Sequence, residues 1–282
     1  MTSLPNRILV LVPHPDDEVL LAGGVIHRAV LEKKQIFVAI ATNGDYLCTD
    51  LSKGERRLAE SLAALRFLGV STENIFFMGY PDTGFEPEVS FLNSLLCAED
   101  THAVFPSACG DHTYGVPCVK EDYAFVRTGA HASYCAQSFE ADLDALILEI
   151  EPELIITTAC GDLHGDHTAL SAFVRRALRK SKKSIALWEG FVHSPAGDDN
   201  WPLITVDMPP MTKPDNFEVT AFCWQDRISI SLPADMLCAE AKDSMKHKAI
   251  CLYPSALCPN EPEVCAYLLA FTKANEVFFS VF

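Results

Sequence analysis

The hydrophobic residues of this chain follow two patterns. Short uninterrupted apolar runs are typical of strands that are buried on both faces of a parallel sheet. Longer segments with apolar residues three or four positions apart are typical of amphipathic helices. The apolar runs cover residues 8–12, 35–42, 74–78, 154–159 and 184–187, and the helical spacing covers residues 17–31, 53–67, 139–150 and 169–178. The alternation of strands and helices predicts an α/β fold.

The C-terminal third of the chain departs from this alternation. From about residue 195 the content of Pro, Gly and Asp rises. The pattern then predicts a β-hairpin over residues 218–231, followed by helices over residues 234–250 and 261–274. We interpret this part as a β-hairpin and helical cap that packs on the sheet.

A second irregular region lies inside the chain, at residues 100–137. Its periodicity is weak, and it holds scattered His, Gly, Pro and Tyr residues. A loop of this length in a compact domain is usually a lid or a binding loop, so we expect it to shape specificity. At 282 residues the chain fits one domain, which we divide into a core at 1–194 with this insertion and a cap at 195–282.

The first apolar run ends in a cluster of residues that commonly bind metals. His14 lies between two prolines and is followed by Asp16, Asp17 and Glu18. The prolines end the strand and hold the imidazole at its carboxyl end, which is where open α/β sheets bind ligands. By itself this cluster is equally compatible with a solvated loop.

The apolar run at residues 154–159 leads into a second cluster of the same kind. It contains Asp162, His164, Asp166 and His167, and a helical pattern follows. If the two strands are neighbours in the sheet, the two clusters face each other at its edge. The pair is therefore better evidence for a functional site than either cluster is alone.

These clusters carry a resemblance to a known family. The segment His14-Pro15-Asp16-Asp17-Glu18 resembles the HPDDE motif of the PIG-L or LmbE-like zinc-dependent N-acetylglucosamine deacetylases, and the segment 164–167 resembles their HxDH motif. Residues 57–70 are similar to the family's RxxE helix, and residues 80–84 to its sugar-contacting loop. The similarities occur in family order and cover about residues 7–95 and 138–192. With the α/β pattern, they imply a Rossmann-like three-layer sandwich with a mostly parallel central sheet.

The resemblance implies one zinc ion per chain, held by His14, Asp17 and His167. Two imidazoles and a carboxylate, with a fourth position open to water, form a common type of catalytic zinc site. Such a metal lowers the pKa of its water and polarises a carbonyl group. An amide bond is then open to hydrolysis.

Further roles follow from the same resemblance. Asp16 is the implied general base, and His164 is the implied acid or oxyanion stabiliser. Asp166 is expected to orient His164. The chain departs from the pattern at Asp162, where some relatives have a Tyr that helps to stabilise the oxyanion.

Two residues are implied to contact the substrate. Arg57 lies three positions before Glu60 on one helix face, so a surface ion pair is the simpler interpretation of its position, whereas the family resemblance implies that it reaches the substrate. Asp82 lies in a segment rich in turn-forming residues and could simply cap the turn. The resemblance implies that it contacts sugar hydroxyls.

Composition narrows the classes of partner and compartment. The formal net charge of −16 and the lack of a basic face in the sequence argue against nucleic acid as a partner. The 11 cysteines are odd in number and irregularly spaced, so we expect free thiols and a cytoplasmic location. No apolar run is long enough to span a membrane, and we see no signal peptide. The sequence leaves the oligomeric state open, although relatives often form homo-oligomers.

We therefore expect a zinc-dependent hydrolase that removes the acetyl group from a small amino-sugar substrate containing N-acetylglucosamine. Within the same class, an amidase acting on a thiol conjugate is the nearest alternative. A metal phosphoesterase would more often have two metals and basic phosphate-binding residues. A non-catalytic sugar-binding protein would have no need of Asp16 and His164. The specific substrate and the metal used in the cell stay open.

Overall fold

The computed structural model describes residues 3–181, 183–258 and 260–281. Its centre is a seven-stranded sheet with the strand order β3-β2-β1-β4-β5-β7-β6. The strands are β1 (Arg7–Val12), β2 (Gln35–Thr42), β3 (Ile75–Tyr80), β4 (Leu154–Thr158), β5 (Ala186–Gly190), β6 (Ile228–Ser231) and β7 (Asn275–Ser280). Neighbouring strands among the first five are parallel, whereas β7 pairs antiparallel with both β5 and β6.

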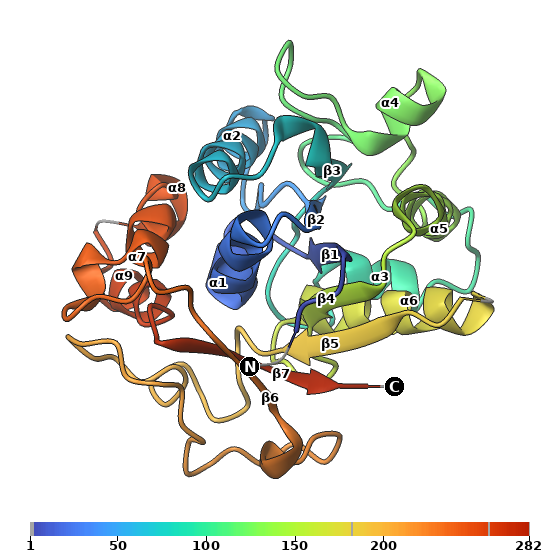
Figure 1. Ribbon diagram of the computed structural model, residues 1–282. Coiled ribbons are helices and arrows are strands. Elements are labelled where there is room, and N and C mark those ends of the chain that lie inside the picture. The colour runs from blue at the N-terminus through green and yellow to red at the C-terminus, as the bar shows by residue number, and fades with distance from the viewer. Residues whose placement is uncertain (1–2, 182, 259, 282) are drawn as a thin grey trace.

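Helices cover both faces of this sheet (Figure 1). They are α1 (Asp17–Leu31), α2 (Ser52–Phe67), α3 (Phe91–Leu96), α4 (Tyr123–Thr128), α5 (Ala136–Ile150), α6 (Gly165–Lys180), α7 (Met245–Ile250), α8 (Pro254–Leu257) and α9 (Pro262–Leu269). The first two and the last three pack on one face, and α3, α5 and α6 pack on the other. The predicted α/β fold with a mostly parallel sheet and helices on both sides is confirmed.

Strand β1 shows why an unbroken apolar run was the correct signal for a central strand. Ile8, Val10 and Val12 point into the core under α1 and α2, while Leu9 and Leu11 point into the core under α5 and α6. All five side chains are fully buried. A strand with helices on both faces has no solvent side, so its sequence has no polar alternation.

The strand order places the two sequence clusters side by side. From β1 the chain builds outward through β2 to β3, and it then returns to β4, which pairs with β1 on its other side. The carboxyl ends of β1 and β4 therefore form the point where the strand order reverses, which is the usual position of a ligand crevice in such sheets.

The C-terminal part differs from its prediction. The β-hairpin expected over residues 218–231 is wrong, because only β6 forms there and its partner is β7, which the apolar pattern did not predict. Strand β7 was not predicted because it begins with two polar residues. Asn275 accepts a hydrogen bond from the backbone of Met211, and Glu276 forms a buried ion pair with Lys246. The helices expected over 234–250 and 261–274 are confined to α7 and α9.

An aromatic cluster fastens the irregular segment between β5 and β6. Phe191, Trp201, Phe217 and Trp224 pack against Phe279 of β7. The long segment therefore has a small apolar core of its own, which joins it to the sheet.

The 100–137 insertion forms α4 and is otherwise irregular. Tyr114 anchors it to the loop after β2 by donating a hydrogen bond of 2.8 Å to Asp45. Its residues 106–109 line a cavity of about 430 Å³ together with Asp82. A role in specificity stays a prediction.

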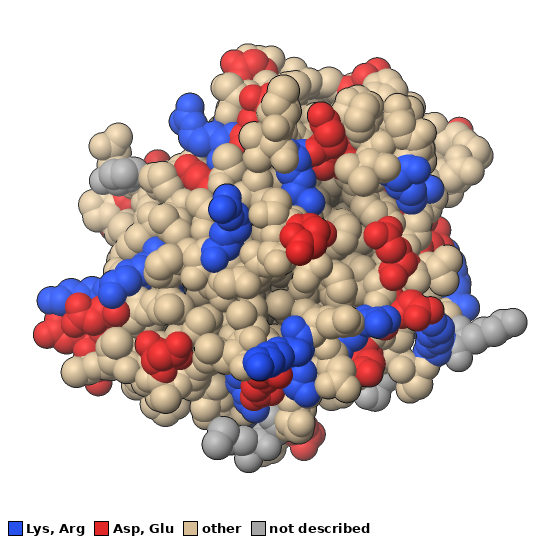
Figure 2. All heavy atoms as spheres, turned by 45° about the horizontal axis from the view of Figure 1, so that its top comes forward, with Lys and Arg blue, Asp and Glu red and all other residues tan. Residues whose placement is uncertain are grey.

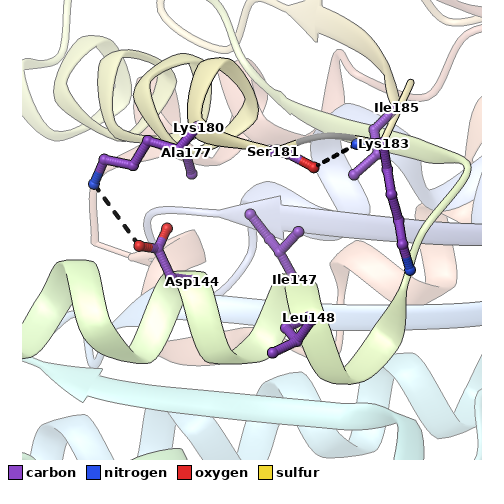
Figure 3. Close-up of a pocket in the computed structure, with 8 residues that line it drawn as sticks. All are labelled: Asp144, Ile147, Leu148, Ala177, Lys180, Ser181, Lys183 and Ile185. Carbon is purple, nitrogen blue, oxygen red and sulfur yellow. Dashed lines mark hydrogen bonds and ion pairs between the residues drawn. The ribbon is translucent and has the colours of Figure 1, made fainter.

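Two surface features complete the fold. On the face in Figure 2, basic side chains are dispersed among acidic ones. A groove of about 390 Å³ lies between α5 and α6, where Lys180 reaches toward Asp144 above the apolar side chain of Ile147 (Figure 3). Ile185, just before β5, also lines it, so this groove lies at the amino ends of the strands, away from the crevice. Among the described residues, no helix has the length and hydropathy to cross a membrane.

Candidate active site

Three side-chain atoms from the two clusters converge beyond the ends of β1 and β4. His14 Nδ1 lies 3.2 Å from Asp17 Oδ2 and 3.2 Å from His167 Nε2. The third side of the triangle, from His167 Nε2 to Asp17 Oδ2, is 3.3 Å. Tetrahedral zinc with ligand bonds of about 2.0–2.1 Å separates its ligand atoms by about 3.3 Å. The donor types and their spacing therefore fit one divalent metal ion, with a further position left for water.

The other nitrogen of each of these imidazoles faces a carboxylate. His14 Nε2 lies 3.1 Å from Asp166 Oδ2, and His167 Nδ1 lies 3.2 Å from Asp162 Oδ1. The second contact is bent away from good hydrogen-bond geometry. Carboxylates in this position fix the orientation and tautomer of a metal-binding imidazole.

This arrangement corrects one expectation. Asp166 was expected to orient His164 through its carboxylate, but that carboxylate binds His14 and the backbone N–H of Leu92. Asp166 reaches His164 only through its own backbone N–H, which donates to His164 Nδ1 at 3.1 Å. The helix start explains the difference, because His164 is the N-cap of α6 and its ring accepts the exposed N–H there.

The charges in the site favour a cation between the two imidazoles. Burial lowers the pKa of His167, but the carboxylates of Asp17 and Asp162 more than offset this and raise it to about 9. Burial likewise opposes a charge on His14, yet Asp166 and Asp17 raise its pKa well above the usual value. The cluster of carboxylates therefore attracts positive charge, which protons supply when no metal is bound.

Asp16 is held in an unusual backbone conformation beside this triad. Its φ is 114°, a region that non-glycine residues rarely adopt. Its N–H donates to Glu18 Oε2 at 2.9 Å, and Arg57 donates to its carboxylate at 3.0 Å and to the carbonyl of Pro15 at 2.6 Å. Burial raises the pKa of Asp16 to about 6, although Arg57 opposes the shift. The carboxylate is thus fixed in a form suited to accepting a proton.

His164 is placed as a neutral hydrogen-bond donor. Its Nδ1 accepts a backbone N–H, so the proton of the neutral ring lies on Nε2. Burial and the nearby imidazoles of His14, His167 and His193 lower its pKa. The centroid of its ring lies 4.4 Å from that of His14, and the two residues line one pocket.

The two expected substrate contacts also line this pocket, which has a volume of about 260 Å³. Arg57 is already bonded to Asp16 and to the carbonyl of Gly44. Gly44 has a φ of 65°, and a Cβ there would come within 2.4 Å of the guanidinium, so this approach requires glycine. Asp82 caps its turn by accepting the N–H of Gly84, as the alternative interpretation expects. Contact of either residue with substrate stays a prediction.

Sequence reasoning missed three residues that border the site. Asp162, noted only as a departure, holds the backbone N–H groups of Val192 and His193 as well as facing His167. His193 follows β5 and packs beside Phe85, whose ring lies 4.8 Å from that of His164. His193 could have been predicted, because it is a polar residue just after β5, and β5 is the strand next to β4 in the sheet.

Comparisons with known proteins identify similar sequences and similar folds. Two curated relatives match short stretches. A putative glucosamine-6-phosphate deaminase-like protein of Bacteroides thetaiotaomicron is 39% identical over 46 residues, which are 16% of this chain and 7% of the relative. The 1D-myo-inositol 2-acetamido-2-deoxy-alpha-D-glucopyranoside deacetylase of Kribbella flavida is 36% identical over 100 residues, which are 30% of this chain and 33% of the relative. Each match thus spans a third or less of the relative.

Solved structures share the fold over nearly the whole chain. A deacetylase of teicoplanin biosynthesis superposes with a TM-score of 0.57 at 17% identity and 97% coverage of both chains. The antimicrobial pseudoaglycone deacetylase Dbv21 superposes with a TM-score of 0.55 at 16% identity, over 98% of this chain and 97% of its own. The sequence profile of the PIG-L family, described as GlcNAc-PI de-N-acetylase, matches residues 9–178, more than half of the chain. This chain therefore belongs to the PIG-L family of deacetylases.

Proposed function

We propose that this protein is a zinc-dependent hydrolase that removes the acetyl group from a small molecule containing N-acetylglucosamine. The observation that carries the proposal is the triangle of His14, Asp17 and His167, with sides of 3.2, 3.2 and 3.3 Å. Family membership and the amino-sugar name of the Kribbella relative support the substrate class.

The chemistry follows from the groups around the triad. A bound zinc ion would polarise the amide carbonyl and lower the pKa of a water molecule. Asp16 takes the proton as that water attacks the carbonyl carbon, and Arg57 keeps its carboxylate in position. The same carboxyl group then returns the proton to the nitrogen as the carbon–nitrogen bond breaks. Acetate and the free amine leave.

His164 acts as the oxyanion donor in this proposal. Its Nε2–H is available because Nδ1 is occupied by the backbone N–H of Asp166. A neutral donor strengthens its hydrogen bond as negative charge develops on the carbonyl oxygen. This role suits a ring whose pKa is lowered by burial better than the role of a charged acid does.

The alternatives fit these contacts less well. A two-metal phosphoesterase needs a second ligand set. Two further groupings occur near the site, His14 with His164 and His167, and His14 with Asp82 and Asp166, and both reuse His14. A sugar-binding protein has no use for an aspartate held at a φ of 114° beside the triad. An amidase acting on a thiol conjugate would use the same groups and differs only in substrate.

Matched substitutions test the proposal. Asp16→Asn keeps the shape of the side chain and leaves the triad intact, so we expect unchanged zinc content and a loss of acetate release of about 100-fold or more. His14→Ala and His167→Ala remove ligands and should lose both. Metal analysis and acetate release from a methyl glycoside of N-acetylglucosamine measure the two effects. Undiminished turnover by Asp16→Asn would exclude Asp16 as the base.

A further inference from the structure

A second cavity lies next to the pocket of about 260 Å³ at the triad, which we name the metal pocket. It has a volume of about 690 Å³, and both cavities are lined by Asp16, Arg57, His193 and Leu268. Because the two cavities share these side chains, they are adjacent, and the group attached to a sugar at the triad would lie next to the second cavity. We name this second cavity the outer pocket.

The walls of the outer pocket come largely from the C-terminal part of the chain. Helices α8 and α9 supply much of its lining, and the irregular segment after β5 supplies Asp198, Asp199 and Ile204. These residues lie outside the segment 9–178 that matches the family profile. The outer pocket therefore combines Asp16, Lys53 and Arg57 of the matched segment with a larger set of residues from outside it.

The lining separates into an apolar wall and a charged rim. The apolar wall consists of Ile204, Ala256, Pro262, Val264, Tyr267 and Leu268. The charged rim consists of four carboxylates and two cations, which are Asp16, Asp198, Asp199, Glu263, Lys53 and Arg57. Carboxylates outnumber cations in the rim, and the whole chain has a net charge of −16. Both charges disfavour an anionic occupant. The wall itself favours an uncharged apolar group.

The volumes of the two pockets also favour a bound group in the outer pocket. Ligand pockets commonly have volumes of about 300–1,000 Å³. The metal pocket, at about 260 Å³, lies below that range, and the outer pocket, at about 690 Å³, lies within it. The two together suit a molecule with a compact sugar at the triad and a larger group beyond Asp16.

We infer that the outer pocket binds an uncharged apolar aglycone, an alkyl or aryl group attached to the sugar, so that the preferred substrate is an apolar glycoside of N-acetylglucosamine. This inference rests on the proposed deacetylase function and names the substrate class of the same site. Tyr267 supports the assignment, because its hydroxyl donates to the carbonyl of Val192 and its ring faces His193 at 5.6 Å, which leaves a rigid aromatic surface between the two cavities.

The test compares acetate release from the methyl and phenyl glycosides of N-acetylglucosamine, each as both anomers, by the zinc-loaded protein. We expect kcat/KM for one phenyl anomer to exceed that of the matching methyl glycoside by about tenfold or more, mainly through KM, since apolar burial supplies the difference. A ratio near one, with clear turnover of the methyl glycoside, would overturn the inference and leave the proposed function standing. No release from any glycoside would overturn the proposed function and this inference with it.

A matched pair of variants places the effect in the outer pocket. Ile204→Asp puts a charge into the apolar wall, and Val206→Asp makes the same change two residues away, outside the lining. Both side chains are exposed, at 60% and 81%, so folding should tolerate either change. The phenyl-to-methyl ratio should fall toward one in Ile204→Asp and stay at the wild-type value in Val206→Asp. Equal ratios in the two variants would show that the preference arises elsewhere and would contradict the assignment.

Discussion

One carboxylate lies beside the outer nitrogen of each of the two imidazoles, those of His14 and His167. The carboxylate of Asp166 contacts His14 Nε2, and the carboxylate of Asp162 faces His167 Nδ1. The sequence predicted that the clusters of His14 and His167 face each other, because each follows a recognisable strand. It could not predict these partners, since Asp162 is positioned by backbone N–H groups that follow β5, about 30 residues away in the sequence.

The role of Asp166 leads to a prediction about metal affinity. Asp166→Asn keeps an acceptor for the backbone of Leu92 but removes the negative charge behind His14. We expect zinc affinity to fall by about 10–100-fold, measured by competition with a chromophoric chelator. The control is Asp111→Asn, an exposed carboxylate of the insertion. Equal affinities in the two variants would contradict the orienting role.

The raised pKa of His167 leads to a second prediction at this scale. With a pKa of about 9, the ring carries a proton at pH 7 in the metal-free protein, and binding of a metal must displace it. Zinc affinity should therefore rise as the pH rises from 6 toward 9, by about tenfold per pH unit for each proton displaced. Calorimetry in buffers of different ionisation enthalpy measures the released protons. Affinity that does not change over this range would show that the site is unprotonated before metal binds.

Among the secondary-structure elements, helix α1 is hydrogen-bonded to both members of a buried ion pair that joins α7 to the C-terminal strand β7. Glu276 accepts the backbone N–H groups of Gly24 and Val25 and lies 2.6 Å from Lys246 of α7, which also donates to the carbonyl of Leu20. Because α1 begins at Asp17, these contacts tie the C-terminal part to the site. Glu276, which forms these contacts, is also one of the polar residues that prevented the prediction of β7 from its apolar pattern.

Breaking that pair should cost substantial stability. Lys246→Met leaves the carboxylate of Glu276 buried without its cation, so we expect the free energy of unfolding to fall by about 3–5 kcal/mol. Lys242→Met serves as the control, since Lys242 is largely exposed and its ion pair with Glu240 contributes little to stability. Chemical denaturation of both variants gives the two values. Similar losses would indicate that the buried pair contributes no more than a surface pair.

At the scale of the whole molecule, the site exists because β1 and β4 are neighbours although about 140 residues separate them. The reversal of strand order brings the two sequence clusters to one edge, and the C-terminal helices close the crevice on one side. Unbroken apolar runs predicted the parallel core correctly. The outer pocket could not be predicted from the same pattern, because its lining combines the short helices α8 and α9 with the irregular segment after β5, and the pattern does not place these parts relative to one another.

The dependence of catalysis on bound zinc can be measured as acetate release from a glycoside of N-acetylglucosamine, by protein stripped of metal with a chelator and then titrated with zinc. The triad of His14, Asp17 and His167 predicts that release stops on stripping and returns in proportion to zinc bound, reaching its maximum at one ion per chain. Release that continues undiminished in the stripped protein would contradict the account.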